Sequence, residues 1–205
     1  MDTDPKETVR RGYDALSHRY DEAFGTDAKY GPWIADLLGR LPGQAEVLDL
    51  GCGTGVPVVR DLAAAGHRVR GVDISAVQIA RARALVPAAA FARADIAALD
   101  LPGESLDAVV CLYALIHLPL AEQPALLGRI GRWLRPGGTL LATTGHRAWT
   151  GTDPDWLGGG VPMWWSQADA ARYREWITGA GLVVEAEEFV PEGEGGHALF
   201  LARRP

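Results

Sequence analysis

The sequence predicts an α/β fold: a doubly wound, mostly parallel seven-stranded sheet with helices on both faces and an antiparallel C-terminal hairpin. Three observations support this. Short strand-like runs alternate with Ala-rich helical stretches between residues 46 and 145. The runs are apolar along their whole length, which is typical of parallel strands covered on both faces. The last two runs flank the Gly-rich segment 191–196, a pattern typical of a β-hairpin.

The first part of the chain is expected to be helical. Apolar residues at helical spacing predict a helix over residues 6–24. A second helix is expected from residue 30 to about residue 41, where Pro42 and Gly43 end it. We expect residues 1–43 to form an N-terminal helical cap on the core that follows.

Residues 44–145 are expected to form the ligand-binding core. Strands are predicted at residues 46–51, 68–74, 91–95, 106–114 and 138–145, and helices at residues 56–66, 76–85 and 119–134. Ser75 is expected to cap the helix 76–85, because its hydroxyl can accept a hydrogen bond from a free backbone N–H. In a sheet of this type the ligand binds at the carboxyl ends of the strands.

The chain after the core is expected to close the site. Residues 146–166 are rich in Gly and Trp, and we predict a loop that acts as a lid. A helix near residues 167–180 and strands at 182–190 and 197–204 follow, so that residues 167–205 form the last helix and the hairpin. A length of 205 residues fits a single domain over residues 1–205.

Charge and composition exclude several classes of function. The chain carries 20 basic and 26 acidic residues, a net charge of −6, which argues against nucleic acid as a partner. No apolar stretch approaches the roughly 20 residues needed to span a bilayer, so no membrane association is expected. The two cysteines, and the absence of His, Asp and Glu at ligand spacing, argue against a metal site. The first 30 residues do not resemble a signal peptide, and we expect a cytoplasmic protein.

The strongest local signal is the segment VLDLGCGTG at residues 47–55, where a predicted buried strand ends in a Gly-rich turn and leads into a helix. Glycines there let the backbone approach a ligand closely. Three carboxylates, Asp49, Asp73 and Asp95, lie at or near the ends of three successive strands, which suits a cationic ligand better than a pyrophosphate. We expect Asp73 to accept hydrogen bonds from ribose hydroxyls.

The Gly-rich turn distinguishes two cofactors. A dinucleotide fingerprint needs Gly or Ala where this chain has Val56, which argues against a nicotinamide oxidoreductase. The spacing from Asp49 to Gly55 instead resembles the D-x-G-x-G-x-G motif of the class I S-adenosylmethionine-dependent methyltransferases. The resemblance covers residues 46–145 in order and spacing, through the segments RGVDIS, ARADIAALDLPGESLDAVVCLYALIHLP and LRPGGTLLATTG. It implies the predicted fold and S-adenosylmethionine as the cofactor.

The resemblance also implies a role for individual residues. The methionine part of the cofactor would lie against Gly51, Cys52, Gly53 and Gly55, with Asp49 facing its ammonium group. Asp73 would hold the ribose, and the adenine would lie between Ile74 and Ile96 with Asp95 accepting from its amino group. The remaining cofactor contacts would come from Tyr20, Cys111 and Leu112.

Two histidines are candidates for a catalytic base, since each follows a strand on the ligand side: His117 and His146. The alternative is a structural role for His117 and a solvated position in a loop for His146. The substrate is expected to contact an aromatic set together with one histidine: Tyr30, Trp33, Tyr113, Trp149, Trp164, Trp165 and His197. The alternative for the Trp-rich segment is that it covers the core.

The predicted function is methyl transfer from S-adenosylmethionine to an oxygen or nitrogen of a small organic metabolite, by a monomer or homodimer. No N-P-P-[FY]-like segment follows the fourth strand, which argues against DNA and protein amide methylases. The alternative is a non-methylating S-adenosylmethionine-binding protein or a cyclase on the same fold, because fold does not determine function.

Overall fold

The computed structural model describes residues 4–25 and 27–205. Its main sheet has seven strands in the order β3-β2-β1-β4-β5-β9-β8. The first five strands are parallel: β1 (Glu46–Leu50), β2 (Arg68–Asp73), β3 (Ala90–Arg93), β4 (Leu106–Cys111) and β5 (Leu134–Gly145). Two antiparallel strands complete the sheet, β8 (Val183–Glu192) and β9 (Gly195–Arg203), with β9 beside β5. The predicted sheet is therefore confirmed.

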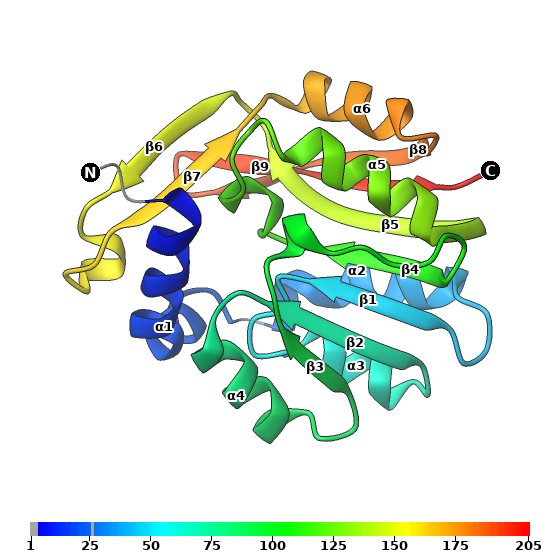
Figure 1. The fold of residues 1–205 in the computed structure, drawn as a ribbon, viewed down its shortest axis with the longest axis horizontal. Helices are drawn as coiled ribbons and strands as arrows, with labels where there is room; N and C mark the ends of the chain where they lie inside the picture. Colours follow the sequence, from blue (N-terminus) through cyan, green and yellow to red (C-terminus); the bar gives the residue numbers. More distant parts are fainter. Residues whose placement is uncertain (1–3, 26) are drawn as a thin grey trace.

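Helices cover both faces of this sheet (Figure 1). Successive strand residues point to opposite faces, so Val47 and Leu48 belong to two different apolar clusters. One face packs against α2 (Asp27–Arg40), α3 (Val58–Ala64) and α4 (Ala76–Leu85), and the other against α5 (Gln123–Trp133) and α6 (Ala170–Gly179). This arrangement leaves the carboxyl ends of the parallel strands to be covered by other segments.

Local sequence accounts for the element boundaries near the site. Ser75 caps α4 as predicted, since its Oγ accepts from the Gln78 N–H at 3.0 Å. The strand predicted over residues 106–114 stops at Cys111, because Tyr113 has a φ of +59° and turns the chain out of the sheet. The chain continues into the short helix η2 (Leu115–His117). A second short helix, η1 (Ile96–Ala98), follows β3.

The segment 146–166 differs from the prediction of a loop. It contains the strand β6 (Trp149–Asp153) and most of its antiparallel partner β7 (Met163–Gln167), with the short helix η3 (Trp156–Gly158) between them. Aromatic and β-branched residues stabilise such a pair through cross-strand contacts, as between Thr152 and Trp164. The three glycines 158–160 lie at the tip of this hairpin and not along its strands.

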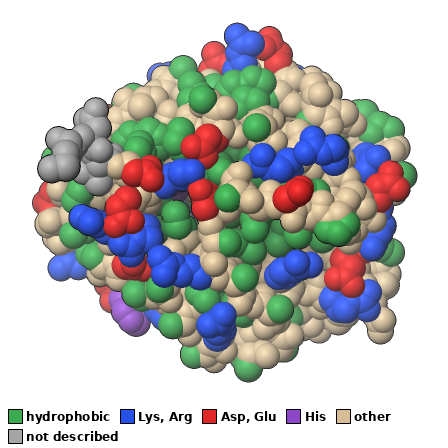
Figure 2. Space-filling model, viewed as in Figure 1, with side chains coloured by type: hydrophobic (Ala, Val, Ile, Leu, Met, Phe, Trp, Pro, Cys, Tyr) green, Lys and Arg blue, Asp and Glu red, His purple; other side chains and the backbone are tan. Residues whose placement is uncertain are grey.

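The β6–β7 hairpin packs against α1 (Pro5–Phe24) near the carboxyl ends of the strands (Figure 1). Met163 is fully buried there, with its Cε 2.5 Å from where a Cβ at Gly12 would lie. Figure 2 shows one face of the molecule, on which basic and acidic side chains are interspersed. None of the helices in residues 4–25 and 27–205 is both long and apolar enough to cross a membrane.

Candidate functional site

Three adjoining cavities lie at the carboxyl ends of β1, β2 and β4. The first, of about 640 Å³, contains Asp73 and is called here the Asp73 cavity. The second, of about 560 Å³, lies along residues 51–58 and is called the glycine-turn cavity. The third, of about 420 Å³, is called the aromatic cavity, and its lining is Tyr13, Tyr20, Phe24, Lys29, Tyr30, Tyr113, Ile116, His117, Trp156, Trp165, Glu192 and His197.

The glycine turn brings bare backbone to two of these cavities. Gly51 has a φ of +74°, and a Cβ on it would lie 2.2 Å from the Ala114 Cβ. Gly53 has a φ of +53° and lines both the Asp73 cavity and the glycine-turn cavity. Side chains at these positions would be strained or would obstruct a ligand, so the sequence places glycine where a ligand must come close.

Asp49 is a buried carboxylate that needs a cationic partner. It is 4% exposed and lines the glycine-turn cavity. Within the part of the chain that the structure describes, no group donates a hydrogen bond to this carboxylate. Burial, and then the charge of Asp73, raise the pKa of Asp49 to about 8. An ammonium group in the cavity would supply the missing donor and charge.

Asp73 is oriented by the backbone around it. Its two carboxylate oxygens accept from the Gly53 N–H at 3.0 Å and the Ser75 N–H at 2.8 Å. Burial nevertheless raises the pKa of Asp73 to about 6. Ile74 and Ile96 line the same cavity, which therefore combines an oriented carboxylate with apolar walls that suit a flat ring.

Asp95 is engaged by a residue that the sequence analysis did not single out. The Lys6 ammonium contacts the Asp95 carboxylate at 2.7 Å and the Glu122 carboxylate at 2.8 Å. The second Asp95 oxygen accepts from the Ala97 N–H at 2.9 Å and so caps η1. Lys6 and Asp95 both line the Asp73 cavity, where they offer a donor and an acceptor side by side.

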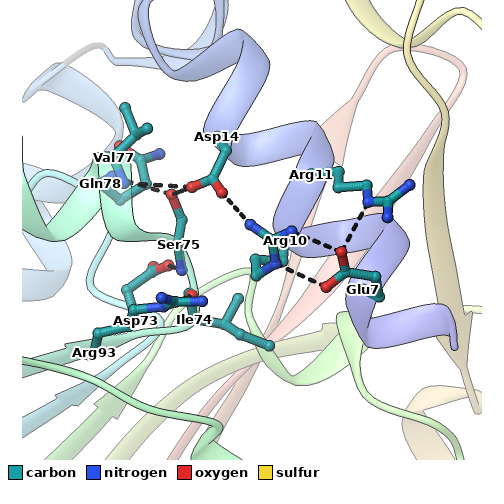
Figure 3. Close-up of polar contacts among 10 residues, drawn as sticks. All are labelled: Glu7, Arg10, Arg11, Asp14, Asp73, Ile74, Ser75, Val77, Gln78 and Arg93. Carbon is teal, nitrogen blue, oxygen red and sulfur yellow. Dashed lines mark hydrogen bonds and ion pairs between the residues drawn. The ribbon is translucent and has the colours of Figure 1, made fainter.

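Polar contacts join α1 to Ser75 and the first turn of α4 (Figure 3). The Asp14 carboxylate accepts from the Ser75 hydroxyl at 2.6 Å and from the Val77 N–H at 3.3 Å, and it also pairs with Arg10. The Ser17 hydroxyl donates to Gln78 at 2.7 Å. Gln78, also missed in the sequence, lines both the Asp73 and the glycine-turn cavities and is 1% exposed.

The aromatic cavity adjoins the Asp73 cavity, since four residues line both: Tyr13, Tyr20, Tyr113 and His117. Tyr13 and Tyr20 come from α1, with ring centroids 5.3 Å apart in an edge-to-face contact. Their spacing of seven residues puts both rings on one face of the helix, a signal available in the sequence. Tyr13 nevertheless was not predicted to belong to the site.

His117 is neutral, and each of its two ring nitrogens takes part in a hydrogen bond. Its Nδ1 lies 2.8 Å from the Trp164 carbonyl oxygen, which can only accept, so Nδ1 carries the hydrogen. Nε2 lies 3.0 Å from the Tyr13 hydroxyl and therefore accepts from it. Burial lowers the pKa of His117 to about 4. The histidine is thus an orienting group for Tyr13 in this structure.

A second set of polar side chains in the lining of the aromatic cavity consists of Lys29, Glu192 and His197. Lys29 Nζ contacts Glu192 Oε2 at 2.7 Å, and His197 Nε2 lies 3.6 Å from Glu192 Oε1. His197 Nδ1 lies 3.3 Å from the Thr144 carbonyl oxygen. The Lys29 ammonium also lies 4.2 Å from the centre of the Tyr113 ring. Lys29 and Glu192 were not predicted as site residues.

The predicted site residues divide into two groups. Most of them line one of the three cavities: Tyr20, Asp49, Gly51, Cys52, Gly53, Gly55, Asp73, Ile74, Asp95, Ile96, Leu112, Tyr30, Tyr113, Trp165, His117 and His197. Five lie elsewhere. Cys111 is in the apolar core, Trp164 offers its carbonyl, Trp149 is half exposed on β6, Trp33 lines separate grooves along α2, and His146 packs against Phe189.

Metal binding finds no support in the described residues, which contain no group of three His, Cys, Asp or Glu side chains placed to hold an ion. The two cysteines are both buried and unbonded. The described lining of the three cavities is instead rich in carboxylates, aromatic rings and histidines.

Comparison with known proteins identifies the family. Residues 47–138 match the family model described as a methyltransferase domain. The 27-O-demethylrifamycin SV methyltransferase of Amycolatopsis mediterranei is 31% identical over 203 residues, covering 88% of this chain and 70% of that protein. Two other curated methyltransferases are longer, so that the matches span 33% and 54% of their lengths.

Solved structures show the same fold. The magnesium protoporphyrin IX methyltransferase of Synechocystis with bound S-adenosylmethionine superposes with a TM-score of 0.76 at 21% identity, covering 99% of this chain and 98% of the other. The [4+2]-cyclase SpnF superposes with a TM-score of 0.73 at 21% identity, covering 96% and 94%. Together with the Gly-rich turn and its carboxylates, these likenesses establish that the chain belongs to the class I S-adenosylmethionine-dependent methyltransferases and uses S-adenosylmethionine as its cofactor.

Proposed function

We propose that this enzyme transfers a methyl group to an oxygen or nitrogen atom of a small organic molecule bound in the aromatic cavity. The observation that carries the proposal is the common wall of the aromatic and Asp73 cavities, which share Tyr13, Tyr20, Tyr113 and His117. A molecule in the aromatic cavity would meet a cofactor in the Asp73 cavity along this shared wall. The aromatic lining of this cavity suits a small flat or apolar molecule.

The cofactor supplies an electrophilic methyl group on a positively charged sulfur. We assign its ammonium group to Asp49, its ribose to Asp73 and its adenine to the space between Ile74 and Ile96. Gly53 lets the backbone approach the cofactor closely. Asp49 supports the assignment most strongly. Its carboxylate is buried and accepts no hydrogen bond from the described residues, so it is suited to bind a cation.

The aromatic cavity supplies alignment and shields the reaction from water. Its rings, with Tyr13 oriented by His117, restrict how a flat or apolar molecule can lie. The low pKa of His117 and the engagement of both its nitrogens favour a positioning role over that of a base. His146 lines none of the three cavities, so we do not assign it a step in the reaction.

Known relatives support a small substrate. The rifamycin enzyme is named for a small molecule, and 70% of its length is spanned by this chain. We accordingly propose that nucleic acids and membranes are not partners, that the protein acts in the cytoplasm, and that it works as a monomer or homodimer. The net charge of −6 agrees with the first of these.

One experiment separates methyl transfer from the alternative of a cofactor-binding protein or cyclase, which the likeness to SpnF keeps in view. The purified protein is incubated with S-adenosylmethionine and a panel of small hydroxylated and amino-substituted aromatic compounds. Methyl transfer predicts S-adenosylhomocysteine in equal amount to a methylated product by mass spectrometry. A product formed without S-adenosylhomocysteine would support the cyclase, and tight cofactor binding with no product from any compound would contradict the proposed transfer.

A further inference from the structure

We propose that His197, supported by Glu192, accepts the proton of a substrate hydroxyl, so that the methyl acceptor is the oxygen of a neutral alcohol or phenol. This inference rests on the proposed function and deepens it. It assigns a catalytic role to His197, near the start of β9, and a positioning role to Glu192, at the end of β8.

The hydrogen bonds of His197 leave one nitrogen available as a base. Nδ1 is directed at the Thr144 carbonyl oxygen at 3.3 Å, which can only accept, so Nδ1 carries the hydrogen. Nε2 is then unprotonated in the neutral ring, and it faces the cavity side occupied by Glu192 at 3.6 Å. His117 has no such free nitrogen, because its Nε2 already accepts from Tyr13.

Glu192 is placed to stabilise His197 after proton transfer. A hydrogen bond donated by the protonated His197 Nε2, and then the contact with Lys29, lower the pKa of Glu192 to about 2, so this carboxylate is ionised when His197 carries the transferred proton. A protonated His197 would form an ion pair with this carboxylate across a gap that is already 3.6 Å. The charged form of His197, with a hydrogen on each ring nitrogen, would thus be stabilised by the Thr144 carbonyl oxygen and by Glu192.

The charges of the aromatic cavity favour a neutral substrate. Among its lining residues, the permanently charged side chains are Lys29 and Glu192, which pair with each other at 2.7 Å. A carboxylate substrate would need an unpaired cation here, and it would need no base, since it arrives as an anion. A hydroxyl group needs a base and no counter-charge, which is what the cavity offers.

Tyr113 supplies an independent sign of a polar ligand. Its hydroxyl is buried and has no hydrogen-bond partner among the described residues, although the ring lines both cavities. A buried hydroxyl without a partner costs free energy, which a polar substrate group would recover. The His197 ring lies next to Tyr113, with centroids 5.0 Å apart, so a hydroxyl bound there would be close to both.

The proposed step is balanced in atoms and electrons. The hydroxyl proton passes to His197 Nε2, and an oxygen lone pair forms the new bond to the methyl carbon. The electron pair of the broken carbon–sulfur bond stays on sulfur, which becomes the neutral thioether of S-adenosylhomocysteine. His197 returns its proton to solvent when the products leave.

The test uses three probes with one apolar body and different acceptor groups: 2-naphthol, 2-naphthoate and 2-naphthylamine. Each is titrated by calorimetry into protein saturated with S-adenosylhomocysteine, and each is incubated with S-adenosylmethionine for mass spectrometry. The proposal predicts that 2-naphthol binds about tenfold or more tightly than 2-naphthoate and is the probe that is methylated. Tighter binding of the naphthoate, methylation of the amine instead of the naphthol, or binding of none of the three would overturn it.

Variants separate catalysis from binding. His197→Asn is expected to lower kcat for 2-naphthol by about 100-fold, the lower end of the range for general bases, while its Kd changes by less than about threefold. Glu192→Gln is expected to lower kcat less than His197→Asn does and to leave Kd nearly unchanged. His18→Asn, an exposed histidine on α1, serves as the matched control with unchanged kcat and Kd.

The division of each effect between kcat and Kd provides a readout that a structural role would not give. Both His197→Asn and Glu192→Gln should lower kcat for 2-naphthol and leave its Kd nearly unchanged. The other titratable residues that line the same cavity as His197 are Tyr13, Tyr20, Lys29, Tyr30, Tyr113 and His117. Full activity of His197→Asn, or an effect of Glu192→Gln on Kd alone, would overturn the assignment.

The same experiments distinguish failure of the hydroxyl assignment from failure of the proposed function. If 2-naphthoate or 2-naphthylamine is methylated, the chain is a small-molecule methyltransferase and only the hydroxyl assignment is lost. If no probe is methylated while S-adenosylmethionine binds, the broader compound panel decides the function.

Discussion

The site has two halves that differ in how they are assembled. We call the Asp73 and glycine-turn cavities the cofactor half, and the aromatic cavity the acceptor half. The cofactor half comes from consecutive strand–turn–helix units and carries buried, unneutralised acid, with Asp49 at 4% and Asp73 at 8% exposure. The acceptor half comes from distant segments and is aromatic, with its one acid paired to Lys29 at 2.7 Å. The difference agrees with our proposal that charge recognises the cofactor, whereas ring shape and a proton acceptor select the substrate.

The largest expected effect comes from breaking the cofactor half at Asp73. Asp73→Ala removes the acceptor for the Gly53 and Ser75 N–H groups and for the ribose. We expect the affinity for S-adenosylmethionine to fall by about 2 kcal/mol or more, because charge-assisted hydrogen bonds are lost. Calorimetry measures this, and Asp100→Ala, at an exposed aspartate, is the control. Unchanged affinity in Asp73→Ala would refute the assignment.

The second prediction concerns pH. The pKa of Asp49 is raised to about 8 and that of Asp73 to about 6, so the ligand-free protein binds protons at neutral pH that a cation must displace. The affinity for S-adenosylmethionine should therefore rise between pH 6 and pH 9, by up to about tenfold per unit below the pKa of Asp49. Calorimetry at four pH values measures this slope, and a flat profile would contradict it.

The same shifts affect folding with the opposite sign. Both carboxyls hold their protons more tightly in the folded than in the unfolded state, so stability is full below about pH 4 for these groups and is lost as the pH rises towards 8. Asp49→Asn should thus raise the thermal midpoint of the ligand-free protein at pH 8. A lower midpoint at that pH would count against the raised pKa.

The third prediction uses two glycines to distinguish backbone strain from obstruction of the cofactor-binding cavities. Gly53→Ala places a Cβ at a φ of +53° in the cofactor cavities, whereas Gly137→Ala places one at a φ of +84° with no atom within 4 Å. Each should cost about 1 kcal/mol of folding stability from backbone strain. Only Gly53→Ala should also weaken cofactor binding, by about tenfold. Equal affinities in the two variants would show that the turn does not face the cofactor.

The smallest expected effect belongs to the acceptor half. Glu192 has its pKa lowered to about 2, so the stability from its ion pair is present above about pH 4.5 and is lost as the pH falls towards 2. Its side chain is 34% exposed, so we expect Glu192→Gln to cost no more than about 1 kcal/mol at pH 7. Urea unfolding tests this against Glu194→Gln, at an exposed residue of the same hairpin turn.

The contrast between the halves also explains what could be predicted from the sequence. The glycine turn, Asp49 and Asp73 were recognisable because a local strand–turn–helix unit places them. The sheet followed from the alternation of strand-like and helical runs. These features depend on contacts between neighbouring units, which a linear pattern records.

The acceptor half depends on contacts that no local pattern records. Lys29 from α2 meets Glu192, 163 residues away, and Tyr13 meets His117, 104 residues away. Glu192 lies in a segment that the sequence indicates as a turn, and the β6–β7 hairpin was mistaken for a loop because its glycines suggested flexibility. One signal was available: the chain has two lysines, Lys6 and Lys29, and both line the site.

The central claim, that the first half binds the cofactor and the second half binds the substrate, is tested most directly by one calorimetric series. S-adenosylmethionine is titrated at pH 8 into the unmodified protein, Asp49→Asn and His197→Asn. The account predicts a loss of about tenfold or more in affinity for Asp49→Asn, because a buried charge loses its partner, and an unchanged affinity for His197→Asn. Equal affinities in all three proteins, or a loss in His197→Asn as large as in Asp49→Asn, would contradict it.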